Sequence, residues 1–158
     1  MTIWIAIFLF LHVMGAIIAF GPTFAFPIIG AMSGKEPQHA NFAARAIDAM
    51  ADQRVEPLAI FQGITGLVLI WLTGFNPFNQ LWLGLGIVLY LIALGFALFV
   101  QRATSKKLVQ LTSTPPPPGA TGPSPELLAT VKKSQQGGMF LGLMILVIVL
   151  LMVTKPTL

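Results

Sequence analysis

The chain has 158 residues, of which 56% are hydrophobic and only 9% are charged, and its mean hydropathy is +0.85. Soluble globular domains carry about 25% charged residues, so this composition excludes a water-soluble fold. The chain has no cysteine, which excludes disulfides, thiolate metal sites and covalently attached c-type haem.

The first apolar segment, residues 3–29, is predicted to be a retained transmembrane helix. It is longer than the apolar region of a signal peptide, about 7 to 15 residues, and no Lys or Arg precedes it. Gly21, Pro22 and Pro27 interrupt its end. Because proline removes a backbone donor and clashes with the preceding turn, we expect a kink or an unwound stretch there.

His12 lies near the middle of this first segment, about 14 Å from its end by helical rise. Gly15, Ala16 and Ala19 share its helix face. Two interpretations stay open. A haem or chlorophyll-type tetrapyrrole could lie on the small residues, with His12 as its only histidine ligand to the metal, because His39 falls in a loop. Alternatively, the small residues admit a neighbouring helix and His12 forms a hydrogen bond across the interface.

The next stretch, residues 30–57, is predicted to be a loop that contains an amphipathic helix. Ser33 and Glu36 have the spacing of a helix start, and Pro57 suits the first turn of the following helix. The apolar arc, about 140° wide, comprises Phe42, Ala43, Ala46, Ile47 and Met50. Since the polar face carries acids as well as bases, we interpret this helix as a cap over the chain's own bundle, with a membrane-surface or docking element as the alternative.

Three further transmembrane helices are predicted at residues 58–74, 81–100 and 138–153. The fourth is short for a bilayer, but residues 126–135 are expected to be helical before it. Between the third and fourth lies a proline-rich linker, residues 113–125, which we interpret as a spacer.

Nearly all basic residues fall in the two long loops, which lie on one side of a four-span chain. Lys and Arg in short loops favour the cytoplasmic side, so both termini are predicted outside. This placement also explains the net charge of +4 without a nucleic-acid partner. The predicted fold is an all-α, four-span transmembrane helix bundle, a single domain over residues 1–158, in a bacterial inner membrane.

By these boundaries no Asp, Glu, Lys or Arg lies inside a span, which argues against a transport relay built from buried charges. The usual catalytic and nucleotide-binding motifs are also absent. The remaining polar candidates inside the spans are His12, Gln62, Thr65 and Tyr90. Tyr90 lies at the same depth in the third span as His12 in the first, so we predict that it points toward His12, as its direct partner or beside a cofactor.

Three stretches carry a family resemblance: residues 11–16 (LHVMGA), residues 51–57 (ADQRVEP) and residues 63–67 (GITGL). Together they resemble a family of bacterial predicted integral membrane proteins of unknown function with four helices. More distantly, the early histidine is similar to that of membrane-bound protoporphyrinogen oxidase and CopD-like copper-resistance proteins. That likeness implies a haem or metal role for His12.

Two functions follow from these observations. The first is a non-enzymatic accessory or structural subunit of a larger membrane complex. The second is a protein that holds one tetrapyrrole, with Gly15, Ala16, Ala19 and Tyr90 around His12. Glycines such as Gly138 and Gly142 permit close helix approach, either within the bundle or in a homodimer.

Overall fold

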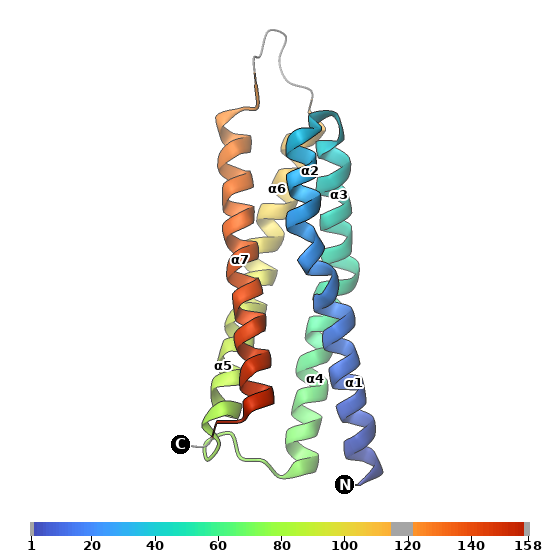
Figure 1. Ribbon diagram of the computed structural model, residues 1–158, viewed down its shortest axis with the longest axis vertical. Coiled ribbons are helices and arrows are strands. Elements are labelled where there is room, and N and C mark those ends of the chain that lie inside the picture. The colour runs from blue at the N-terminus through green and yellow to red at the C-terminus, as the bar shows by residue number, and fades with distance from the viewer. Residues whose placement is uncertain (1, 115–121, 157–158) are drawn as a thin grey trace.

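The computed structural model describes residues 2–114 and 122–156, and within these ranges it contains helices and turns but no strand. The all-α prediction is therefore confirmed. Four long helical rods run side by side, and both termini lie at the same end (Figure 1). Each rod is long and apolar enough to cross a membrane.

Each rod except the last combines several elements. The first comprises α1 (Ile3–Phe20), the 3-10 helix η1 (Gly21–Ala25) and α2 (Phe26–Lys35). The second comprises the 3-10 turn η2 (Pro37–His39), α3 (Ala40–Met50), the π-helix η3 (Ala51–Val55) and α4 (Glu56–Thr73). The third comprises α5 (Leu81–Phe96), the π-helix η4 (Ala97–Gln101) and α6 (Arg102–Ser113), and the fourth is α7 (Pro125–Thr154).

The rods are longer than a bilayer core requires. They contain 30 to 37 residues, or about 45 to 55 Å of helix, against about 30 Å of hydrocarbon. We call α1, α4, α5 and residues 138–154 the lower half, and α2, α3, α6 and residues 125–137 the upper half (Figure 1). Every charged residue except Lys155 lies in the upper half or where the halves meet. The lower half therefore has the length and the composition of a membrane-spanning unit.

Three rods leave α-helical geometry where the two halves meet. Pro22 lies within η1 and Pro27 follows it, which confirms the interruption predicted near the end of the first span. Pro57 is the second residue of α4, which begins directly after η3. Because Pro57 has no N–H to donate, the wider π turn before it accommodates the missing helical bond. Pro57 thus lies in the first turn of α4 as predicted, although the rod is already helical from Pro37 onward.

The amphipathic helix predicted within residues 30–57 is confirmed as α3, but the loop predicted around it is wrong, because almost all of this stretch is helical. Ser33 is not a helix cap: it lies inside α2, where its hydroxyl donates to the Gly30 carbonyl at 2.8 Å. The turn between the first two rods falls at Glu36 instead, whose φ of −126° and ψ of 74° end α2. The second loop is also shorter than predicted, since α6 and α7 extend into it and helix over residues 126–135 is confirmed. Residues 115–121 of the proline-rich linker lie outside the described ranges.

The amphipathic helix α3 runs alongside α2 and α6 and forms one side of the upper half. It packs on α2 and α6, and Asn41 Nδ2 donates to the Val109 carbonyl at 3.2 Å. Ala43 and Ala44 are buried, whereas Phe42, predicted on the buried arc, is 71% exposed. The helix packs against its own chain, as the cap interpretation expects. However, it continues the rod of α4 and does not lie across the end of the bundle.

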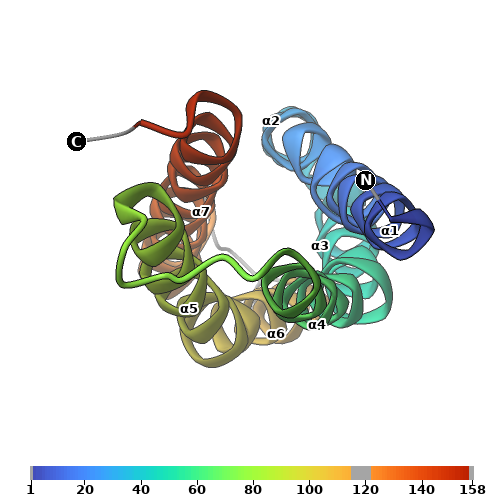
Figure 2. The ribbon, with the colours of Figure 1, turned by 90° about the horizontal axis from the view of Figure 1, so that it is seen from below.

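The rods form an open arc (Figure 2). Packing runs from α1 to α4 and from α3 to α6, and both α5 and α6 pack on α7. Within the described residues no extensive packing joins α1 to α7. The first and last rods therefore form the two edges of the arc, each covered by the chain on one side only.

Candidate functional site

The predicted histidine lies in the interface between α1 and α4. Its ring nitrogen Nδ1 is 2.9 Å from the hydroxyl oxygen of Thr65. Thr65 is only 1% exposed, the most deeply buried of the large side chains in the described residues. An unpaired polar group in hydrocarbon costs several kcal/mol, so this contact satisfies two groups at once.

The hydrogen bonds of Thr65 determine which imidazole nitrogen carries the proton. Its hydroxyl oxygen is also 3.1 Å from the carbonyl oxygens of Phe61 and Gln62. A hydroxyl has a single proton, and carbonyl oxygens only accept, so Thr65 donates to these carbonyls and accepts from His12. We therefore assign the His12 proton to Nδ1 from the network, which leaves the lone pair on Nε2.

The small residues beside His12 pack against α4. Gly15 and Ala19 are buried. A Cβ atom added to Gly15 would lie 3.0 Å from Oε1 of Gln62 and 3.4 Å from Cδ1 of Phe61. In the same interface, α4 approaches closely through Gly66, where an added Cβ would lie 3.2 Å from Cε1 of His12. The small-residue face predicted from the sequence is thus occupied by a neighbouring helix.

Gln62 adds a second polar group to this interface. The residue is 9% exposed, and its Oε1 atom has no hydrogen-bond partner among the described residues. It gives the α1–α4 interface an acceptor with unused capacity. This oxygen can accept from a donor such as water. In the described part of the chain no three His, Asp or Glu side chains come together as a metal site.

Tyr90 does not pair with His12, so the predicted contact is wrong. Its hydroxyl donates to the carbonyl of Ala59 at 2.9 Å, and its ring packs on Gly63. The reason is the order of packing, because α1 lies against α4 and not against α5. Counted from the lower ends of their helices, His12 and Thr65 are at nearly the same height, about 12 to 14 Å.

A charged cluster at the junction of the two halves escaped the sequence analysis. Arg102 forms ion pairs with Asp52 and with Glu56, the latter at 3.2 Å between Nη1 and Oε2. Asp52 lies in η3 and Arg102 follows η4 directly, so the cluster ties the two π-helices together. No local spacing reveals such a pair, because the partners are far apart in sequence.

Comparison with known proteins identifies the family but no activity. Residues 6–156 match the family described as Predicted integral membrane protein (DUF2269), so the chain belongs to that family. The match extends well beyond the first half, where the resemblance was noted. No curated protein and no solved structure matches the chain. The more distant likeness to CopD-like proteins stays a prediction.

Proposed function

We propose that this protein is a non-enzymatic accessory subunit that packs against another membrane protein through the edge of its arc formed by α7. The observation that carries the proposal is the open arrangement of Figure 2, in which α1 and α7 are each covered on one side only. A four-helix unit that closed on itself would leave less of these two helices to other neighbours. The uncovered edge is thus available to a partner helix.

The lower part of α7 supports this assignment. Gly138 and Gly142 are one helical turn apart, and apart from their own helix turn no atom of the described residues lies within 4 Å of a Cβ added to either glycine. These glycines therefore do not serve packing within the described chain. In membranes, where apolar side chains gain little by leaving lipid, small residues at this spacing permit the close backbone approach that stabilises helix pairs.

The proposed orientation places the upper half in the cytoplasm of a bacterial cell and both termini outside. Its support is the charge distribution, since every Lys and Arg except Lys155 lies in the upper half or at the junction. The upper half extends about 20 Å beyond a 30 Å core. A partner could therefore contact the subunit within the membrane and above it.

Matched substitutions at two glycines test the proposal. Gly142→Leu fills the edge on α7, whereas Gly95→Leu adds the same side chain to α5, where a Cβ also meets no atom within 4 Å. We expect native gels of gently solubilised native membranes to show a complex larger than one protomer that Gly142→Leu disrupts and Gly95→Leu preserves. A single-protomer size for the unmodified protein contradicts the proposal. A size of two copies, without another subunit, replaces it with a homodimer.

A second candidate, a protein with one bound tetrapyrrole, is favoured by the tautomer of His12. With its proton on Nδ1, Nε2 is the nitrogen that could ligate a metal, and Thr65 would orient the ring as partners of metal-binding histidines do. The small-residue face predicted to hold a macrocycle does not have room for one, because α4 packs on Gly15, and Ala19 is buried. A ligand would have to lie beyond Nε2, outside the α1–α4 interface.

Absorption spectra of the purified protein decide between the two candidates. The tetrapyrrole candidate requires a visible band in protein from native membranes, and His12→Ala should abolish it. Protein without visible absorbance, or a band that survives His12→Ala, eliminates this candidate and leaves the subunit proposal.

A further inference from the structure

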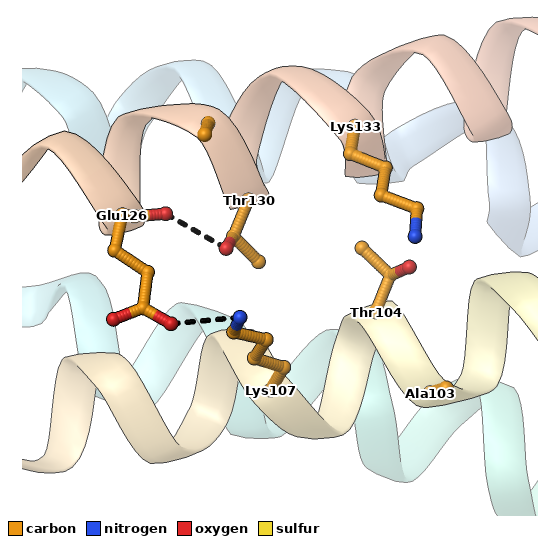
Figure 3. Close-up of a pocket in the computed structure, with 7 residues that line it drawn as sticks. Ala103, Thr104, Lys107, Glu126, Thr130 and Lys133 are labelled. Atoms are coloured by element: carbon orange, nitrogen blue, oxygen red, sulfur yellow. Dashed lines mark hydrogen bonds and ion pairs between the residues drawn. The ribbon is translucent and has the colours of Figure 1, made fainter.

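A pocket of about 320 Å³ with two lysines in its lining opens in the upper half between α6 and the first turns of α7. Figure 3 shows its labelled side chains. The two helices contribute one lysine each, Lys107 from α6 and Lys133 from α7. Ala103 and Ala129 also line the pocket.

The two lysines differ in their partners. Lys107 Nζ lies 2.7 Å from Oε1 of Glu126. Lys133 has no ion pair within the described part of the chain, and its ammonium group points into the space above Thr104 (Figure 3). With one carboxylate and two ammonium groups, the pocket carries one net positive charge.

The floor of the pocket is buried and uncharged. Thr104 and Thr130 are 5% and 6% exposed. Their hydroxyl groups donate to the carbonyls of Val100 and Glu126, each at 2.8 Å. The ammonium groups are therefore the donors that remain for a bound anion, and charge-assisted hydrogen bonds are the stronger kind.

The lower end of the pocket, at Lys133, reaches the headgroup layer of a bilayer. Lys133 comes five residues before Gly138, the start of the apolar stretch of α7, so it lies about 8 Å above that stretch. Headgroup layers extend about 5 to 8 Å on each side of the hydrocarbon core. Lysine side chains commonly reach phosphates at this depth.

We propose that this pocket binds the phosphodiester of an anionic phospholipid, with the phosphate between Lys107 and Lys133. A phosphodiester carries one negative charge, which balances the net charge of the pocket. The phosphate competes with Glu126 for Lys107 and is the sole ionic partner of Lys133. The proposal is independent of the subunit function, since it concerns α6 and the upper part of α7.

Neighbouring lysines provide a matched test in the full-length protein. Lys132 has the same charge at almost the same height but does not line the pocket. We expect Lys133→Gln to weaken binding of phosphatidylglycerol about fivefold or more, the effect of one basic residue near an anionic headgroup. Lys132→Gln should change it less than twofold. The measurement is native mass spectrometry of detergent-solubilised protein titrated with dioleoyl-phosphatidylglycerol, with dioleoyl-phosphatidylcholine as the reference lipid.

A third variant should act in the opposite direction. Glu126→Gln removes the carboxylate that competes for Lys107 while keeping the shape of the side chain, so phosphatidylglycerol should bind more tightly than to the unmodified protein. Misfolding cannot produce a gain in affinity.

Three results would overturn the proposal. Equal losses in Lys132→Gln and Lys133→Gln indicate diffuse attraction without a site. Equal binding of the two lipids removes the role of charge. Glycerophosphoglycerol that displaces the lipid at equal concentration assigns the pocket to a soluble phosphodiester.

Discussion

The bond between His12 and Thr65 can be isolated by replacing Thr65 with valine. Valine has nearly the shape of threonine, so the buried volume is retained where Thr65 is only 1% exposed. The change removes the acceptor for Nδ1–H of His12. The carbonyls of Phe61 and Gln62 keep their own helical partners and lose only the extra hydroxyl contact.

The expected cost of Thr65→Val is about 1 kcal/mol. Hydrogen bonds between transmembrane helices contribute about 0.6 kcal/mol on average and up to about 1.7 kcal/mol. The upper part of this range applies here, because the substitution leaves a donor without a partner inside the membrane. Thr73→Val is the matched control on the same helix. The Thr73 hydroxyl donates only within α4, to the Leu69 carbonyl at 2.7 Å, so its loss should cost less than about 0.5 kcal/mol.

The free energy of unfolding in detergent micelles measures both effects, and a double-mutant cycle with His12→Phe assigns them. In the His12→Phe background, Thr65→Val should cost at least about 0.5 kcal/mol less than in the unmodified protein, because the shared bond is already lost. Additive costs would refute the pairing of His12 with Thr65. Equal costs for Thr65→Val and Thr73→Val would show that only the bond within the helix matters.

Three other predictions follow from the packing, the junction and the charges. Gly63→Ala should destabilise the protein by about 1 to 3 kcal/mol in the same unfolding assay, because the added Cβ meets the hydroxyl of Tyr90 and lies 3.0 Å from its Cζ. Tyr90→Phe should relieve part of this cost, and no relief would contradict the clash. Arg102→Gln should speed hydrogen exchange in η3 and η4, since it removes both ion pairs of the junction, whereas Arg45→Gln, an exposed change in α3, should leave exchange there unchanged. A cysteine at position 113 should react with an impermeant maleimide only after cells are opened, and labelling of intact cells would reverse the proposed orientation.

The class of fold and the four apolar segments could be predicted from the sequence because both depend on local composition. A run of about 20 apolar residues must form a helix in lipid, whatever its neighbours are. The interruption at Pro22 and Pro27 was predictable for the same reason, because proline acts on its own turn. The amphipathic helix within residues 30–57 was predictable from its apolar arc, but its continuity with α4 was not, because no local pattern there indicates an unbroken rod.

The partners within the candidate site depend on packing that no single sequence reveals. His12 was recognised as a polar residue deep in a span, but its pairing with Thr65 requires α1 to lie against α4. Several polar residues lie at the same depth as His12 and are candidates for its partner. Only the order in which the rods pack distinguishes Thr65 from Tyr90. The ion pairs of Arg102 were missed for the same reason, since its partners lie in another rod.

The π-helices also set the rotational phase between the two halves. A π turn contains one residue more than an α turn, and one residue corresponds to about 100° around a helix. The side of α3 that meets α6 is therefore rotated relative to the side of α4 that meets α1. Deleting Gln53 would return η3 to α-helical phase and turn Ala43 and Ala44 away from the surface that now covers them. Substitutions in the two halves can be compared face by face only after this offset is applied.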